Sequence, residues 1–235
     1  MSDEKQAIYL KYAYIVVAAL EILALMLDID RLHHLAKPLL MPLLLVYFRK
    51  GLKGRLSSSF MLAVLGLLFS FVGDSAFMFA DDNQLFFLLG LGAFSITQIM
   101  YSVSFNKAID LDSAKPNKLM KVLYAVPLLI VLGGVLNMVW DKVSVELFAA
   151  MAIYSLLSLN MVLSAVLRHG RASVEGTKQV ILGAVFFMFS GVLLVLDRFH
   201  VPMNNAQVFI MAPYILAQWH IINGLQKFYN ETSSY

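Results

Sequence analysis

The sequence predicts an all-α polytopic membrane protein, in which one domain of residues 1–235 forms a bundle of eight transmembrane helices. Three observations lead to this fold class. Apolar residues make up 60% of the chain and charged residues only 14%, whereas soluble domains contain about 45–50% and about 25%. Eight stretches are apolar over lengths that can cross a bilayer. Finally, lysines and arginines concentrate in alternate loops.

The eight predicted spans follow one another with short connections. They cover residues 8–27, 34–48, 57–80, 85–105, 119–140, 145–167, 178–196 and 206–228. The second span is short, and Pro42 is expected to kink it. The apolar runs are too continuous for the alternating pattern of an outer-membrane barrel, and an open sheet cannot cross a bilayer.

The distribution of basic residues predicts the orientation. Fourteen of the 18 lysines and arginines fall on one side, and Arg31, Lys37, Lys142 and Arg198 fall on the other. Because the side rich in lysine and arginine is normally cytoplasmic, we expect both termini inside a bacterial-type inner membrane. These basic loops suit contact with anionic lipid headgroups and not with nucleic acid. The oligomeric state is left open.

Three ionisable residues are predicted to lie at similar depth in the outer half of the membrane. Asp74 is the only charged residue in the apolar run 60–80 and lies six residues below the outer end of its helix. A carboxylate there costs about 2.5–3.5 kcal/mol, so intramembrane carboxylates are usually functional. Glu21 also lies six residues below an outer helix end, and Lys37 starts the second span. A structural Glu21–Lys37 pair, or a Lys37 that reaches the interface, is the alternative.

Two glutamines form a deeper polar level. Gln98 and Gln218 lie thirteen and twelve residues in from the outer ends of their spans. They either support a site or act as interhelical hydrogen-bonding residues, which are ordinary in membrane bundles. Both follow an aromatic residue by four positions, Phe94 and Tyr214. This echo predicts a parallel repeat of four plus four helices, with a site between the halves.

Several kinds of chemistry are not expected. The chain has no cysteine, so it has neither a disulfide nor thiol chemistry. Of its five histidines only His220 lies well inside a predicted span, since His34 is the first residue of the second span, so we expect no metal site. The sequence lacks the Gly-x-Ser-x-Gly motif that is typical of serine hydrolases. We expect no cofactor, and carboxylate acid–base chemistry or proton-coupled movement remains.

Motifs along nearly the whole chain resemble the YhhN-type membrane proteins, the lysoplasmalogenase family. They are the segment 71–77 (FVGDSAF), Lys37-Pro38, Phe94 with Tyr101, Tyr154 with Met161 and Ala165, Ser190 with Arg198-Phe199, and Tyr214 with Gln218. The resemblance implies an eight-helix enzyme that cleaves the vinyl-ether bond of lysoplasmalogens to a fatty aldehyde and a glycerophospho-base. It implies Asp74 as a catalytic residue, with Lys37, Gln98, Tyr101, Ser190, Tyr214 and Gln218 as substrate-binding or supporting residues.

The chain departs from the family pattern at two positions. The family typically has Ser-Asp in its seventh helix, where this chain has Ser190-Gly191, and a histidine where this chain has Gln98. Glutamine cannot transfer a proton as histidine does. We therefore expect Glu21 to replace the lost carboxyl and to form a catalytic acid–base pair with Asp74. The alternatives are a non-catalytic relative that binds a lysolipid-like amphiphile and a proton-coupled transporter.

Overall fold

The computed structural model describes residues 3–53, 57–80, 83–110, 113 and 118–232. In these ranges every regular element is an α-helix, which confirms the predicted all-α fold of eight helices. The eight helices are α1 Asp3–Met26, α2 Asp30–Lys50, α3 Ser58–Phe77, α4 Gln84–Lys107, α5 Lys118–Val139, α6 Val145–Val166, α7 Val174–Phe199 and α8 Ala206–Thr232.

Seven of these helices are long and apolar enough to cross a membrane, and α2 is the exception. The prediction of a short second helix is wrong, because α2 has 21 residues and continues through Pro38 and Pro42. At 1.5 Å per residue it is about 31 Å long, the thickness of a bilayer core. Asp30, Arg49 and Lys50 at its ends lower its apolar character.

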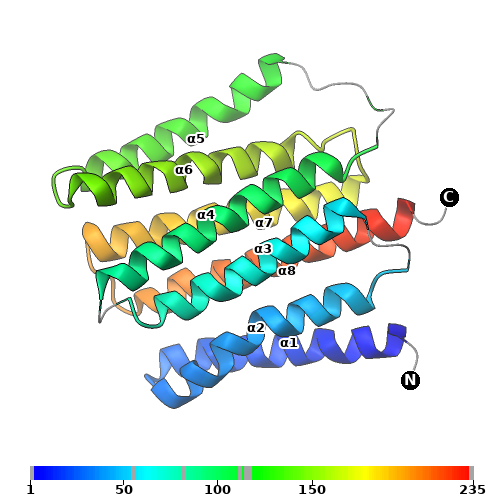
Figure 1. Cartoon of the computed structure of the whole chain (residues 1–235), viewed down its shortest axis with the longest axis horizontal. Helices are drawn as coiled ribbons and strands as arrows, with labels where there is room; N and C mark the ends of the chain where they lie inside the picture. Colours follow the sequence, from blue (N-terminus) through cyan, green and yellow to red (C-terminus); the bar gives the residue numbers. More distant parts are fainter. Residues whose placement is uncertain (1–2, 54–56, 81–82, 111–112, 114–117, 233–235) are drawn as a thin grey trace.

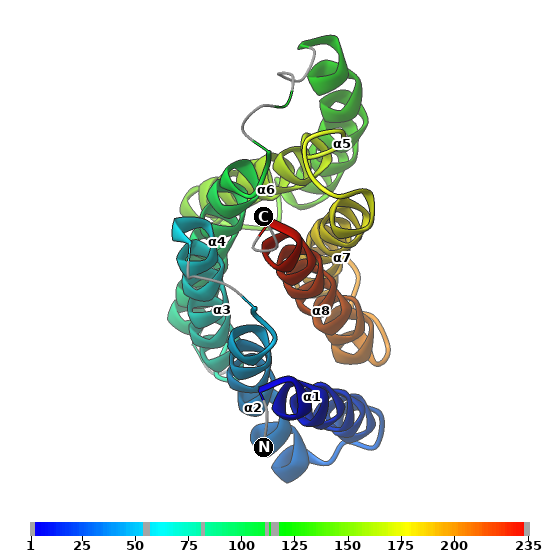
Figure 2. The same ribbon diagram turned by 90° about the vertical axis from the view of Figure 1, so that its right-hand side faces the viewer.

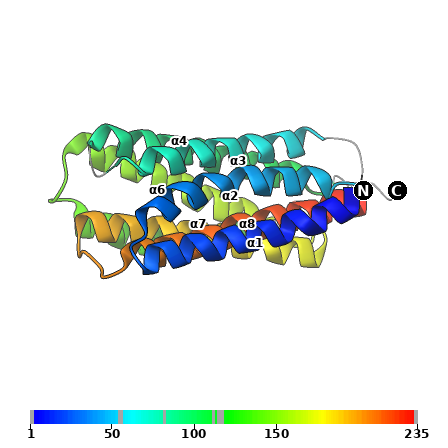
Figure 3. The same ribbon diagram turned by 90° about the horizontal axis from the view of Figure 1, so that it is seen from below.

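The helices run side by side, and the two termini lie at the same end of the bundle (Figure 1). Seen end-on, α5, α6, α4, α3 and α2 form a curved row, with α7 and α8 on its inner side (Figure 2). Helix α4 packs against α6, so α5 is left at the edge. Helix α1 lies beside α2 at the other end of the row (Figure 3).

Consecutive helices are neighbours within each half of the chain. Contacts join α1 to α2, α2 to α3 and α3 to α4, and the same pattern joins α5 through α8. Antiparallel helices with short loops adopt such rows by default. The predicted four-plus-four repeat therefore stays a prediction.

Polar residues and tight turns set the helix ends. Ser57, Asn83, Ser144 and Ser173 precede α3, α4, α6 and α7, and each side chain accepts a hydrogen bond from a main-chain N–H of the first turn. The short connections before α2 and α8 contain residues with positive φ, Asp28 and Asn205. Aspartate and asparagine are the non-glycine residues that tolerate this conformation best.

The outer faces of the bundle are apolar, as a lipid-facing surface requires. Helix α5 exposes Leu119, Leu123 and Ile130 by 71%, 66% and 70%. A water-soluble monomer rarely exposes so continuous an apolar face. The polar side chains that interest us lie instead in the interior, where Glu21, Asp74, Gln98 and Gln218 are all buried.

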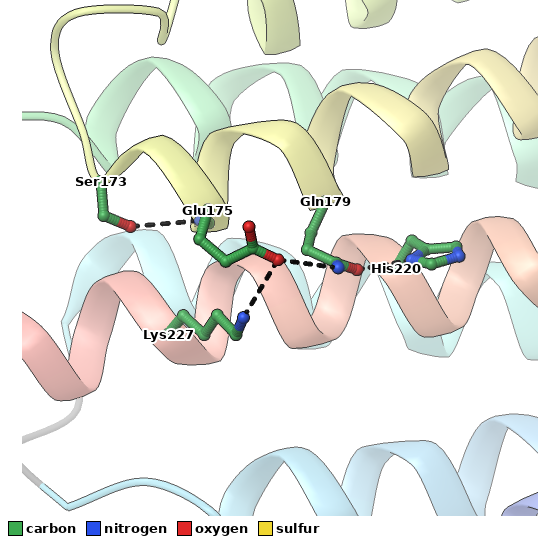
Figure 4. A network of polar contacts seen from close by, with 6 residues as sticks. Ser173, Glu175, Gln179, His220 and Lys227 are labelled. Carbon is green, nitrogen blue, oxygen red and sulfur yellow. Dashed lines mark hydrogen bonds and ion pairs between the residues drawn. The ribbon is translucent and has the colours of Figure 1, made fainter.

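Glycines bring α7 and α8 into main-chain contact. A Cβ atom on Gly183 would lie 2.7 Å from the carbonyl oxygen of Ala217, and one on Gly224 would lie 2.6 Å from that of Gly176. Small residues allow such close approach between membrane helices. Near the termini, polar contacts also join the pair: Glu175 accepts hydrogen bonds from Lys227 and Gln179, and Gln179 also contacts His220 (Figure 4).

The close α7–α8 contact predicts a position-specific effect of a single methyl group. Gly183→Ala should destabilise the folded protein by about 1–3 kcal/mol, because the new Cβ meets a main-chain atom that cannot move independently. Thermal unfolding in detergent micelles measures the effect. Gly133→Ala is the matched control, since a Cβ there meets nothing within 4 Å. Equal unfolding temperatures for both variants would contradict the packing argument.

Candidate functional site

Asp74 lies near the C-terminal end of α3 and is almost completely buried. The hydroxyl of Tyr214, from α8, donates a hydrogen bond to its Oδ2 atom at 2.7 Å. Lys37 and Glu21 lie close enough to act on the carboxyl electrostatically. A buried carboxyl needs such partners, because an unpaired one is expensive in an apolar interior.

The Tyr214 hydroxyl is one end of a hydrogen-bonded chain across the bundle. Gln218, one turn further along α8, donates through Nε2 to Ser70 at 2.8 Å and more weakly to Tyr214 at 3.4 Å. Tyr101 of α4 donates to Gln218 Oε1 at 2.5 Å. These four side chains and Asp74 come from three helices, α3, α4 and α8. The network therefore fixes the helices relative to one another and holds the Asp74 carboxyl at its end.

Asp74 forms part of the wall of a cavity between the helices. The lining residues come from α2, α3, α4, α6, α7 and α8, at the end of the bundle opposite the two termini. Most are apolar or aromatic, such as Phe87, Phe94 and Phe187. An apolar cavity with a few polar groups is typical of a site for an organic ligand.

The guanidinium group of Arg198 lies in the wall of this cavity. Arg198, in the last turn of α7, donates to the carbonyl oxygen of Ala80 at 2.6 Å. Its guanidinium carbon also lies 4.8 Å from the centre of the Phe87 ring, a cation–π contact. Arg198 thus links α7 to the α3–α4 hairpin where the cavity opens.

Glu21 does not share this cavity wall. It is buried, and its Oε1 atom forms an ion-pair contact of 2.8 Å with Nδ1 of His33 on α2. Its other oxygen has no hydrogen-bonding partner among the described residues. The equal depth expected for Glu21 and Asp74 does not bring them into one hydrogen bond, since each has a different partner. A catalytic Asp74–Glu21 pair stays a prediction.

Of the other candidate residues, some line the cavity, whereas Gln98, Tyr101 and Gln218 do not. Lys37, Ser190 and Tyr214 line the cavity, and the Ser190 hydroxyl donates to the carbonyl oxygen of Ile210 at 2.8 Å. Gln98 is fully buried and is not a lining residue. Neither atom of its amide group has a hydrogen-bonding partner within the described part of the chain.

A comparison with known families assigns the chain to one of them. The model of the YhhN family matches residues 32–225. The chain belongs to the YhhN family. This family includes lysoplasmalogenases. No curated protein and no solved structure matches the chain.

Gly191, where the family resemblance implies an aspartate, lies against a tyrosine side chain. Gly191 lines the cavity, and a Cβ built on it would lie 2.7 Å from the Tyr154 hydroxyl of α6. The phenol of Tyr154 therefore takes the space that a side chain at position 191 would need. Gln98 lies beside this hydroxyl but outside hydrogen-bonding geometry. A tyrosine therefore lies against the position at which the family resemblance implies a carboxyl.

Sequence reasoning placed Tyr154 only among the family motifs and left His33 in a loop. Tyr154 could not be assigned to the site, because a tyrosine in an apolar run has no distinguishing pattern. His33 follows Glu21 by twelve residues across a turn, a separation that no helical period connects.

The Tyr154–Gly191 contact predicts that an aspartate cannot simply be restored. Gly191→Asp should lower the unfolding temperature, because its Cβ overlaps the Tyr154 hydroxyl. Replacing Tyr154 by leucine in the same protein should remove part of this cost. The two changes should therefore be coupled by at least about 0.5 kcal/mol in a double-mutant cycle.

Gly191→Ala tests the Cβ contact alone, and Gly92→Ala serves as its control, since a Cβ at Gly92 meets nothing within 4 Å. Strict additivity of Gly191→Asp and Tyr154→Leu would show that Tyr154 does not fill this space.

Proposed function

We propose that the protein is an integral-membrane hydrolase that cleaves the vinyl-ether bond of a lysolipid. The products are a fatty aldehyde and a glycerophospho-base. The observation that carries the proposal is the buried Asp74 carboxyl in the wall of an aromatic cavity, hydrogen-bonded by Tyr214. Membership of the YhhN family supports the same activity.

The reaction needs one group that can give and then take a proton. In its protonated form Asp74 donates its proton to the vinyl carbon that is not bonded to oxygen. A C–H bond forms, and the double-bond electrons leave an oxocarbenium ion. Water attacks the carbon bonded to oxygen and releases a proton to the Asp74 carboxylate. The resulting hemiacetal breaks its bond to the glycerol oxygen, giving the aldehyde and the alcohol.

Tyr214 and the chain behind it are positioning residues in this scheme. The hydroxyl binds Oδ2 of Asp74, so Oδ1 is the oxygen left to carry the transferred proton. The negative charge that Asp74 acquires after proton transfer also stabilises the oxocarbenium ion beside it. Glu21, bonded to His33, acts in this proposal through its charge on Asp74, or as the second carboxyl of the predicted pair.

A second candidate function is binding of a lysolipid-like amphiphile without cleavage. It is favoured by one observation, that Asp74 is the only carboxyl among the described residues that line the cavity. Release of aldehyde by the purified protein separates the two functions, since a binding protein releases none.

The proposal includes an orientation in the membrane. With both termini cytoplasmic, the cavity would open toward the outer face of a bacterial-type inner membrane, because it lies at the end of the bundle opposite the termini. Substrate would then come from the outer leaflet.

The decisive test is the role of the Asp74 carboxyl. Asp74→Asn should lower the rate of aldehyde release from a lysoplasmalogen by at least about 100-fold, since an amide cannot supply the proton. Tyr214→Phe should lower it by roughly 10-fold, because only the positioning hydrogen bond is lost. Liquid chromatography with mass detection of the aldehyde measures both rates.

Tyr47→Phe is the matched control, since Tyr47 bonds Asn223 away from the cavity. Glu21→Gln tests the predicted pair, because retained activity would remove Glu21 from the chemistry. Full activity of Asp74→Asn, or no aldehyde from the unmodified protein, would refute the proposed hydrolysis.

A further inference from the structure

A second cavity adjoins the one that contains Asp74. It is lined by segments of α1, α2, α3, α7 and α8 together with their connections. We call it the vestibule. Its lining includes Asp28, Asp30, His33, His34 and Asp197, so it is polar where the first cavity is aromatic. Lys37, Phe77 and Gln207 line both cavities and mark the boundary between them.

Lys37 is a buried cation without a partner at this boundary. Its residue is only 5% exposed. None of the ion pairs or hydrogen bonds in the described part of the chain involves its ammonium group. Asp74 and Glu21 are near, but their close contacts are with Tyr214 and His33. Carboxyls are therefore near Lys37, but none of them contacts its ammonium group directly, and a largely buried polar group without a hydrogen bond is unfavourable.

We propose that Lys37 binds the phosphate of an amphiphilic lipid whose chain lies in the aromatic cavity and whose headgroup lies in the vestibule. Lys37 lines both the aromatic cavity and the polar vestibule. A lipid with its phosphate at Lys37 can therefore place its apolar chain in the first and its charged headgroup in the second. The three vestibule aspartates repel an anion elsewhere in the vestibule, so they confine the phosphate to the ammonium of Lys37. This inference rests on the proposed lipid ligand, but not on its hydrolysis.

The anchor also determines which bond of the ligand faces Asp74. With the phosphate at Lys37, the chain end of the molecule extends past Asp74 into the cavity lined by Phe94 and Phe187. The bond between the glycerol and the chain lies between these two regions. Lys37 would thus select for a phosphate-bearing headgroup and fix the position of the reacting bond along the cavity.

The test compares two lipids of the same chain that cannot be hydrolysed. One is a saturated lyso-ether phosphocholine and the other is the matching alkylglycerol, which lacks the phosphate. Binding is measured by calorimetry on the full chain in maltoside micelles. Lys37→Met should weaken binding of the phosphocholine about 10- to 100-fold and change binding of the alkylglycerol less than about 2-fold. Lys37→Arg should restore most of the loss, because it keeps the charge.

Stability provides a second readout. Lys37→Met removes a buried charge without a partner, so the unfolding temperature without lipid should stay the same or rise. Lys227→Met is the matched control, since Lys227 bonds Glu175 near the C-terminal end of α8 and lines neither cavity. It should leave both affinities unchanged.

Three results would overturn the inference. Equal loss of affinity for both lipids on Lys37→Met would give Lys37 a general structural role. Unchanged affinity for both would remove Lys37 from the site. Glycerophosphocholine, which has the headgroup without a chain, should bind far more weakly than the lipid; equal affinity would assign Lys37 to free phosphodiesters instead. Because neither lipid can be cleaved, these results are independent of whether aldehyde is released from a lysoplasmalogen.

Discussion

The hydrogen bond from Tyr214 to Asp74 connects the only carboxyl of the cavity wall to the interior of the bundle. It joins α8 to α3, and the contacts of Gln218 with Ser70 and Tyr101 continue the connection to α4. In an apolar environment each of these polar groups would be costly alone. Together they form hydrogen bonds with one another. The same contacts that offset the cost of burying Asp74 therefore also define how three helices pack.

The polar interior and the apolar exterior explain how the site is built. Lipid-facing positions, such as those of α5, carry large aliphatic side chains, while the buried carboxyls and amides face the inner side of the helix row. Aromatic rings then fill the space between the helices around Asp74, and Arg198 closes the gap between α7 and the α3–α4 hairpin. The result is an apolar chamber with one acidic group and a basic residue at each of two edges, Lys37 and Arg198.

Much of this arrangement could be predicted from the sequence. Apolar runs give the long helices, and the isolated charge of Asp74 marks the site. The family motifs also name Tyr101, Tyr214 and Gln218, which lie in one hydrogen-bonded chain. The ends of α2 were missed because Asp30, Arg49 and Lys50 interrupt its apolar run. Counting along helices predicts a depth for Glu21 but not the direction of its side chain, and this direction decides that it meets His33. The partner of Gly191 could not be predicted, because no sequence period relates α6 to α7.

The main-chain contact between α7 and α8 has a consequence for motion. Gly183 and Gly224 leave no side-chain layer between these helices, so the pair cannot slide or separate without losing direct backbone contact. Side-chain layers are more compliant, since rotamers can change while the helices stay folded. Helices α2 and α3 meet α8 across such layers, through Tyr47 and Asn223 and through Ser70 and Gln218. We therefore expect a motion that admits a molecule to the cavity to occur at the α2–α8 and α3–α8 interfaces, while α7 and α8 stay together.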